Sequence, residues 1–290
     1  MRIQSNKLKD IITFTKDELK TIYSPNECRS LALILIEYYA HISVAEALSA
    51  PETTINESEL LEINFAVKEL KNHKPVQYIL GQTTFCGITI KVNESVLIPR
   101  PETEELVNII IEENNNFNGK IADLGCGSGC ITLALAHFLP NSEVTGFDLS
   151  EKALSVAKEN SVSLGENNHL RVKFCKKDIL TPNFTDETFD IIVSNPPYVR
   201  EKEKTMMKKN VLCFEPQEAL FVPNEDPLKF YRAIAKFAEK NLNSKGKIYL
   251  EINENFAKDT LNLFIFSNYK SKIIKDLFAK ERFIYLEKLN

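Results

Sequence analysis

Residues 121–130, Ile-Ala-Asp-Leu-Gly-Cys-Gly-Ser-Gly-Cys, decide how the central part of this chain folds. Residues 121–124 are typical of a buried strand, and a turn with glycine at every second position follows at once. Glycine lets a backbone turn tightly and come close to a ligand, because it carries no Cβ atom. Residues 131–139 then show the apolar spacing of a helix. The stretch therefore predicts a strand, a ligand-binding turn and a helix.

Strand and helix patterns continue to alternate after this stretch. Strands are expected at 143–148, 172–174, 189–194 and 247–252, helices at 152–164, 228–242 and 256–264, and a closing hairpin around 273–274 and 283–285. Such alternation is typical of an α/β fold, a Rossmann-like doubly wound sheet with helices on both faces. Ligands bind these sheets at the carboxyl ends of the strands.

The first 75 residues differ in character, because they carry helical apolar patterns and few strand signals. Phe65, Ala66 and Leu70, for example, are spaced for one face of a helix. We expect a small helical bundle over residues 1–75, which either docks another protein or serves as a structural cap.

Residues 76–95 place β-branched residues around Gly87, as a hairpin does. Prolines and acidic residues at 97–106 then precede an apolar run, as at the start of a helix. We predict a hairpin linker over 76–95 and the α/β domain over 96–290.

The composition excludes several classes of protein. Apolar residues make up 43% and charged residues 26% of the 290, as in soluble globular proteins. The net charge of −4 disfavours a protein that holds nucleic acid through many phosphate contacts. No secretory signal or membrane-spanning run is present, so we expect a cytoplasmic protein that does not bind membranes. The six cysteines are scattered without a CxxC pair, which indicates neither zinc nor disulfides.

The glycine turn narrows the class of ligand. Gly125, Gly127 and Gly129 alternate with Cys126 and Ser128. The dinucleotide fingerprint would need glycine at the next position, where the chain has a cysteine that we interpret as a small filler of the turn. The Gly-Lys-Ser/Thr ending of a phosphate-binding loop is also absent. A nucleoside cofactor without a pyrophosphate fits better, and S-adenosyl-L-methionine, with S-adenosyl-L-homocysteine as its product, is the natural candidate.

Acidic residues follow the next two strands. Asp148 ends the strand that comes after the glycine turn, where an acid can accept hydrogen bonds from both hydroxyls of a ribose. The alternative for Asp148 is a helix N-cap. Asp178 is positioned to meet the adenine amino group, with Ile179 beside the ring. A cap or an exposed turn is the alternative for Asp178.

Residues 194–198, Ser-Asn-Pro-Pro-Tyr, end the strand at 189–194. Proline cannot donate a hydrogen bond to a strand neighbour and holds the preceding residue extended, although such dipeptides also mark ordinary turns. Beside a methyl donor, the side-chain oxygen of Asn195 and the carbonyl of Pro196 could accept hydrogen bonds from both N–H groups of a planar nitrogen. These bonds would return electron density to a nitrogen that is otherwise a poor nucleophile. Pro197 and Tyr198 would pack against its plane.

With these motifs, the chain resembles class I methyltransferases that modify planar nitrogens, and more narrowly the release-factor glutamine methyltransferases of the PrmC/HemK family. The resemblance covers essentially the full length. It rests on PVQYILG at 75–81, LIPRPETE at 97–104, DLGCGSG at 123–129, NPPY at 195–198, FEP at 214–216 with Ala219-Leu220, and KDL at 275–277 with Arg282.

The resemblance implies transfer of a methyl group from S-adenosyl-L-methionine to N5 of the glutamine in the Gly-Gly-Gln motif of class 1 peptide chain release factors. It implies that residues 125–129, Asp148, Ile179 and Asn195 bind the cofactor and that residues 195–198 bind the glutamine amide. Many relatives have an aromatic residue where this chain has Ile179. We expect release factors as partners and a monomeric protein.

Two other functions remain open at this point. A DNA or RNA adenine N6-methyltransferase could grip the adenine amino group with the same tetrapeptide, but it must flip its base and follow a phosphate backbone. The chain offers only the short charged run at 200–209, which is either a solvated loop or a contact for the release factor. A non-catalytic binding module with the same fold is the second alternative, since a fold does not determine a function.

Overall fold

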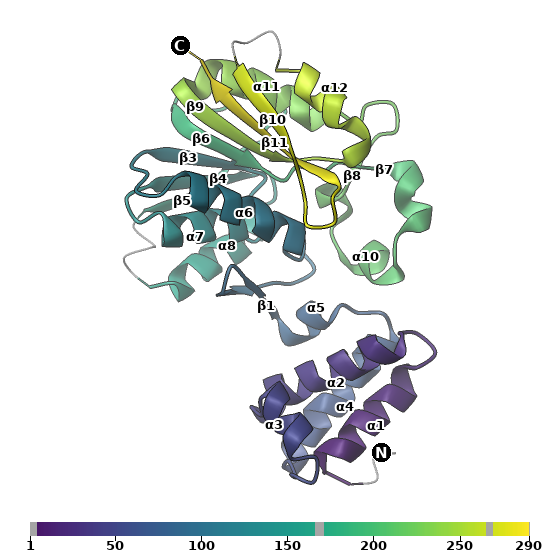
Figure 1. Ribbon diagram of the computed structural model, residues 1–290. Coiled ribbons are helices and arrows are strands. Elements are labelled where there is room, and N and C mark those ends of the chain that lie inside the picture. Colours follow the sequence, from purple (N-terminus) through teal and green to yellow (C-terminus); the bar gives the residue numbers. More distant parts are fainter. Residues whose placement is uncertain (1–4, 166–170, 265–268, 290) are drawn as a thin grey trace. The chain divides into compact units, whose positions relative to one another are not determined.

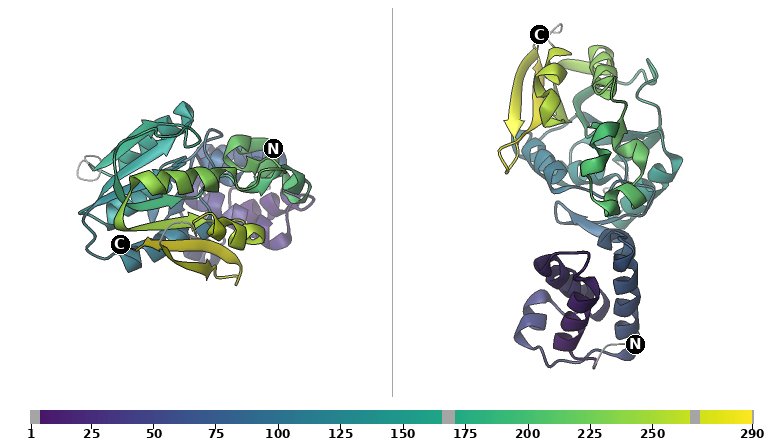
Figure 2. Two further views of the ribbon diagram at one scale, coloured as in Figure 1. Left: turned by 90° about the horizontal axis from the view of Figure 1, so that it is seen from above. Right: turned by 90° about the vertical axis from the view of Figure 1, so that its right-hand side faces the viewer.

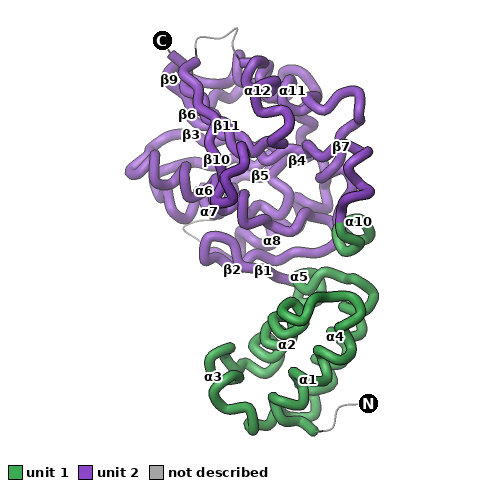
Figure 3. The backbone as a smooth tube through the Cα atoms, turned by 45° about the vertical axis from the view of Figure 1, so that its right-hand side comes forward, with its two compact units in different colours: residues 1–81, 208–214 green, residues 82–207, 215–290 purple. Residues whose placement is uncertain are grey.

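The computed structural model of the chain describes residues 5–165, 171–264 and 269–289. The chain divides into two compact units: residues 1–81 with 208–214, and residues 82–207 with 215–290 (Figure 3). In the described part of the chain, no helix combines the length and apolar character needed to cross a membrane.

The first unit is helical. Its helices are α1 (Leu8–Leu19), α2 (Pro25–Ala40), α3 (Val44–Ser49), α4 (Glu57–Lys71), α5 (Val76–Leu80) and α10 (Lys209–Phe214). Capping boxes at Ser24 and Asn56 satisfy the free amide groups at the first turns of α2 and α4. The helix predicted around residue 65 is confirmed, but the prediction of which residues form its buried face was wrong for one of the three. Ala66 and Leu70 are buried, whereas Phe65 is 55% exposed.

The second unit is built on a seven-stranded sheet with the order β10-β11-β9-β6-β3-β4-β5. The strands are β3 (Lys120–Leu124), β4 (Glu143–Asp148), β5 (Val172–Lys176), β6 (Phe189–Ser194), β9 (Leu242–Glu251), β10 (Tyr269–Lys275) and β11 (Glu281–Lys288). The first five are parallel, and β11 and β10 continue the sheet antiparallel at one edge, coloured yellow in Figure 2. The predicted alternation and the closing hairpin are confirmed.

Helices cover both faces of this sheet (Figure 1). They are α6 (Pro101–Glu113), α7 (Cys130–Phe138) and α8 (Glu151–Ser163) on one face, and α11 (Lys229–Asn241) and α12 (Ala257–Asn262) on the other. Successive side chains of a strand point to opposite faces. Leu124 therefore packs in one buried apolar cluster with residues of α11 such as Ile234, while the side chain of Asp123 meets α7. Side chains at the carboxyl end of β3 are thus covered by helices on both faces of the sheet.

A hairpin and two short strands complete the unit. Strands β1 (Gln82–Phe85) and β2 (Ile88–Lys91) pair antiparallel, as predicted, while residues 76–80 before them are helical. Cys86 and Gly87 close the hairpin with φ of 48° and 74°, as a two-residue turn of the primed type requires. Strands β7 (Val199–Arg200) and β8 (Phe221–Val222) form a separate parallel pair that the sequence patterns did not predict.

Gly146→Ala tests the close contact between β4 and α7. A Cβ atom at this position would lie 2.9 Å from ring carbons of Phe174 and 2.9 Å from Thr132 Oγ1. We expect overpacking to lower the free energy of unfolding by about 1–3 kcal/mol, measured by urea denaturation. Adding Phe174→Leu should recover part of the loss, because it removes the ring atoms. A variant as stable as the wild type would contradict this account.

Candidate active site

The glycine turn joins the carboxyl ends of β3 and β4. The backbone amides of Gly125 and Cys126 both donate to the carbonyl of Phe147, at 2.8 and 3.0 Å. Gly125 and Gly127 have φ of 81° and 53°, a left-handed conformation that glycine adopts without strain. A Cβ atom on either of these two would project into open space, whereas one on Gly129 would come within 3.1 Å of Ala157. The turn therefore leaves an open, backbone-lined surface at this edge of the sheet.

Cys126, Ser128 and Cys130 are buried beneath the turn. Burial raises the pKa of the Cys126 thiol well above its usual range and that of Cys130 to about 12, so both remain neutral fillers. Among the described residues, no three His, Cys, Asp or Glu side chains gather to hold a metal ion.

Asp148 lies across the turn. Its Oδ2 accepts a hydrogen bond from the Gly127 amide at 2.9 Å, and its Oδ1 accepts one from the Ser150 amide at 2.8 Å. Ser150, and not Asp148, is the N-cap of α8, because its hydroxyl accepts from the Ala153 amide. Each carboxylate oxygen can accept a second hydrogen bond. Asp148 is thus fixed by its neighbours but keeps the capacity to bind hydroxyl groups.

Asp178 follows β5 on the same edge. Its Oδ1 accepts from the Leu180 amide at 2.8 Å and its carbonyl accepts from the Thr181 amide at 3.0 Å, so it is a turn residue, as its alternative interpretation held. Ile179 packs against the buried apolar cluster that contains Leu124, and it borders a hollow of about 220 Å³ beside Phe184. The assignment of Asp178 and Ile179 to an adenine stays a prediction.

The Asn-Pro-Pro-Tyr segment leaves the end of β6 next to the turn. The Ser194 hydroxyl donates to the carbonyl of Leu124 at 2.6 Å and so ties the ends of β6 and β3 together. Pro196 is buried, whereas Asn195, Pro197 and Tyr198 are half-buried. The segment is thus placed beside the glycine turn, as predicted from the parallel order of the strands.

Two residues that sequence reasoning missed hold this segment. Asn195 Nδ2 donates to Thr103 Oγ1 at 2.9 Å, and Thr103 Oγ1 in turn lies 2.7 Å from Glu251 Oε2. The Tyr198 hydroxyl donates to Glu251 Oε1 at 2.8 Å. Tyr198 therefore uses its hydroxyl inside the protein, and burial raises its pKa well above the usual range. A signal for Glu251 existed, because it is an acid that directly follows the apolar run Ile248-Tyr249-Leu250 at the end of β9.

Motifs that lie far apart in the sequence also meet here. Glu215 of the FEP motif is buried, and Arg100 of the LIPRPETE motif pairs with its Oε1 at 2.6 Å. The Ile98 amide donates to the other carboxylate oxygen at 3.1 Å. This pair anchors the start of α6, the helix that carries Thr103, to the segment after α10.

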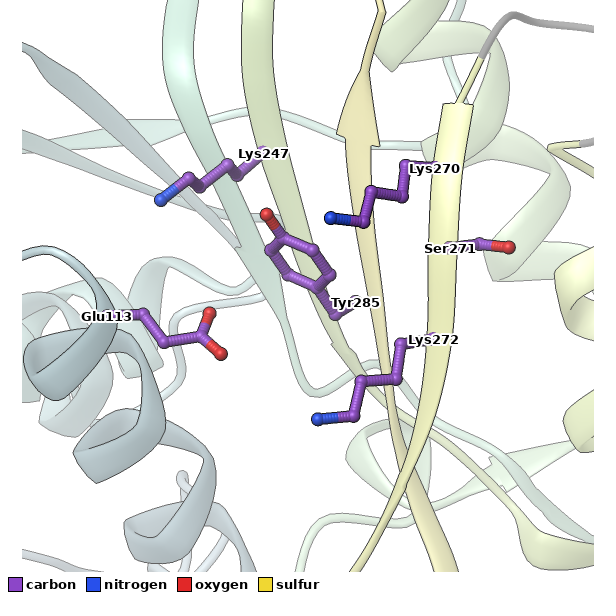
Figure 4. A pocket seen from close by; sticks show the side chains of 6 residues that line it. All are labelled: Glu113, Lys247, Lys270, Ser271, Lys272 and Tyr285. Carbon is purple, nitrogen blue, oxygen red and sulfur yellow. The ribbon is translucent and has the colours of Figure 1, made fainter.

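Another hollow of the second unit lies elsewhere. It measures about 350 Å³ and is lined by Glu113, Lys247, Lys270, Ser271, Lys272 and Tyr285 (Figure 4). Lys247 precedes Glu251 by four residues on β9, so this hollow opens away from the carboxyl edge of the parallel strands. The motifs and the hydrogen bonds, and not the volume of a hollow, therefore define the candidate active site.

Comparisons with known proteins agree with this geometry. A family model described as the methyltransferase small domain matches residues 103–222, and one described as the PrmC N-terminal domain matches residues 10–81. The release factor glutamine methyltransferase of Flavobacterium psychrophilum is 42% identical over 96% of this chain and 98% of its own length. That of Bacteroides thetaiotaomicron is 38% identical over 94% of this chain and 98% of its own.

A solved methyltransferase from Pyrococcus furiosus has the same fold. It superposes with a TM-score of 0.52 at 18% identity and covers 81% of this chain and 100% of its own length. At this identity the likeness supports the fold alone, and it agrees with the predicted α/β architecture.

Asp123, at the end of β3, generates a pH-dependent prediction. Burial raises the pKa of its carboxyl from 3.8 to about 7, against hydrogen bonds from Thr132 that lower it. The folded chain then binds this proton more tightly than the unfolded chain, so the group's contribution to stability is lost as the pH rises from about 4 to about 7. This difference in pKa between the unfolded and the folded chain corresponds to roughly 4 kcal/mol in the free energy of unfolding.

Asp123→Asn removes this titration. Urea denaturation of both proteins between pH 5 and pH 8 should therefore show the wild type losing stability relative to the variant as the pH rises. The same substitution at the exposed Asp186 serves as the control. A difference between wild type and Asp123→Asn that does not change with pH would contradict the prediction.

Proposed function

Because the chain belongs to the release factor glutamine methyltransferases, we propose that its candidate site methylates N5 of the glutamine in the Gly-Gly-Gln motif of class 1 peptide chain release factors, with S-adenosyl-L-methionine as the methyl donor. The observation that carries the residue roles is the Asn-Pro-Pro-Tyr segment beside the glycine turn, with the Asn195 side chain tied to Thr103. Methylation of a release factor glutamine follows from the family, and the residue roles are the proposal.

The residues around the turn fit the cofactor. Gly125 and Gly127 leave open space where a side chain would stand, and Asp148 retains acceptor capacity for ribose hydroxyls. One buried polar atom nearby, Asp123 Oδ1, has no partner among the described residues, which is expected where a polar ligand completes a site. When bound, the cofactor supplies a methyl group on a positively charged sulfur. We propose that residues 125–129, Asp148, Asp178, Ile179 and Asn195 hold it.

Residues 195–198 prepare the acceptor. We propose that Asn195 Oδ1 and the Pro196 carbonyl accept hydrogen bonds from the two N–H groups of the glutamine amide. These bonds hold the nitrogen at near-attack distance and increase its electron density, so the site needs no histidine base. Pro196 and Pro197 restrict the backbone, which keeps the acceptor atoms in place before the substrate arrives.

The charged run at 200–209 does not favour a nucleic-acid substrate. Arg200 pairs with Glu203 at 3.1 Å, and Lys204 lies 3.8 Å from Glu201, so acids of the same run neutralise part of its charge. A backbone-tracking enzyme would instead present unpaired cations to the phosphates. The adenine alternative therefore gains no support.

The helical unit is proposed to dock the release factor. Leu61 and Phe65 on α4 are 46% and 55% exposed, although both are large and apolar. They are four residues apart and therefore adjacent on one face of the helix, and contiguous exposed apolar side chains mark protein-binding sites. We further propose that the protein acts as a monomer in the cytoplasm, where release factors are found.

A competition assay tests the proposed substrate. Purified protein, labelled S-adenosyl-L-methionine, a class 1 release factor and adenine-containing DNA are combined, and both polymers are analysed by mass spectrometry. We expect one methyl group on the Gly-Gly-Gln glutamine and none on the DNA. Methylation of adenine with an unmodified release factor would show that the segment was interpreted correctly and its substrate wrongly.

Asn195→Ala tests the role of the segment. We expect methyl transfer to fall by at least about 100-fold, because an oriented acceptor is lost. Cofactor binding measured by calorimetry should persist, because residues 125–129 and Asp148 still hold the cofactor in this variant. Asn255→Ala is the matched control, since Asn255 is exposed and follows β9, which ends at the same edge of the sheet as β6. Unchanged turnover in Asn195→Ala would remove Asn195 from the mechanism.

A further inference from the structure

We propose that Thr103 and Glu251 are positioning residues that determine which end of the Asn195 amide faces the substrate. This inference rests on the proposed function, in which Asn195 accepts a hydrogen bond from the glutamine amide. It adds two residues to the machinery, neither of which touches the reacting atoms.

Three hydrogen bonds connect these residues in a chain. Asn195 Nδ2 lies 2.9 Å from Thr103 Oγ1, Thr103 Oγ1 lies 2.7 Å from Glu251 Oε2, and the Tyr198 hydroxyl lies 2.8 Å from Glu251 Oε1. Thr103 and Glu251 are 3% and 1% exposed. Both side chains are shielded from water, so their hydrogen bonds are those to the protein partners named above.

The available donors and acceptors determine which atom donates in each of these hydrogen bonds. In the structure both carboxyl oxygens of Glu251 accept hydrogen bonds, Oε1 from Tyr198 and Oε2 from Thr103, so the single hydroxyl proton of Thr103 is donated to Glu251. The Thr103 oxygen can then only accept from Asn195, and it therefore pairs with the NH₂ group of that side chain. A flipped amide would set its carbonyl oxygen against the hydroxyl oxygen with no proton between them. The flipped form would leave buried polar groups unpaired and is disfavoured for that reason.

The orientation of the Asn195 amide matters because its oxygen accepts hydrogen bonds, whereas its NH₂ group donates them. In the orientation fixed by Thr103, Asn195 directs Oδ1 away from the hydroxyl, where it can accept from an N–H group. In the flipped orientation it would present its own N–H groups to those of the glutamine, and no hydrogen bond could form. Without these hydrogen bonds, both orientations of the Asn195 amide would be populated, and only one of them supports the reaction.

Opposing influences act on the Glu251 carboxyl. Burial has the largest effect and raises its pKa above the usual range, although hydrogen bonds from Thr103 and Tyr198 and the nearby charge of Arg282 act in the other direction. The Tyr231 hydroxyl donates to the backbone carbonyl of Glu251 at 3.0 Å and so holds the residue in place. The carboxylate is therefore supplied with donors on both oxygens.

Three variants separate positioning from simple packing. Thr103→Val keeps the shape but removes the hydroxyl, Thr103→Ser keeps the hydroxyl, and Thr260→Val removes a buried hydroxyl that has no partner among the described residues. Single-turnover methylation of a class 1 release factor is measured at saturating S-adenosyl-L-methionine, with cofactor binding and thermal unfolding measured in parallel.

We expect Thr103→Val to lower the rate constant roughly 10- to 100-fold with little change in cofactor affinity, as for other lost orienting interactions. Thr103→Ser should stay within about threefold of the wild type, and so should Thr260→Val. A Thr103→Val variant that methylates as fast as the wild type would overturn the inference, and so would a Thr103→Ser variant that loses as much activity. A wild type that leaves the release factor unmodified would instead refute the proposed function.

If Thr103→Val does not fold, the wild type still decides the question. The side-chain NH₂ resonances of Asn195, assigned by their loss in Asn195→Ala, should exchange with solvent more slowly than those of the exposed Asn255. This is expected because the Asn195 NH₂ group donates to a buried hydroxyl. Equal exchange of the two side chains would overturn the inference.

Discussion

The parallel pairing of β3 with β4 on one side and with β6 on the other is the constraint on which the site depends. The register sets Leu124 opposite Phe147 and Asp123 opposite Val193, so the three strands end at nearly the same level. The amides of the glycine turn then reach the Phe147 carbonyl, and the Ser194 hydroxyl reaches that of Leu124. A slip of one residue in this register would turn these side chains to the other face of the sheet.

Burying acidic side chains close to this edge is energetically unfavourable, and nearby hydrogen-bond donors offset part of this cost. Asp123 has a threonine as its donor, Glu251 has a threonine and a tyrosine, and Glu215 has an arginine and a backbone amide. Removing one partner of a buried charge leaves the other uncompensated, which is far more destabilising than the pair is stabilising. The motifs therefore depend on one another, and the residues that build the site also hold the domain together.

Two kinds of constraint meet at Asn195. The prolines that follow restrict its backbone through covalent geometry alone, and they do so wherever the chain lies. The direction of the side-chain amide depends instead on Thr103 and Glu251, which come from α6 and from the end of β9. A reaction that relies on orienting a poor nucleophile needs both constraints, because an amide nitrogen is activated only when its N–H groups meet acceptors.

The order of strands and helices, the glycine turn and the Asn-Pro-Pro-Tyr segment could be predicted from the sequence, because apolar period, glycine and proline act over a few residues. Placement of Asp148 and Asn195 at one edge followed from the rule that parallel strands end together. The sequence predicted less well which residues of a helix are buried, as the exposed Phe65 shows. Burial depends on which other elements pack against the helix. Thr103 and Glu251 are 148 residues apart, and no local pattern connects them. Only the tertiary structure decided that they meet, since the pairing of β9 beside β6 and the packing of α6 on the same face bring their side chains within hydrogen-bonding distance.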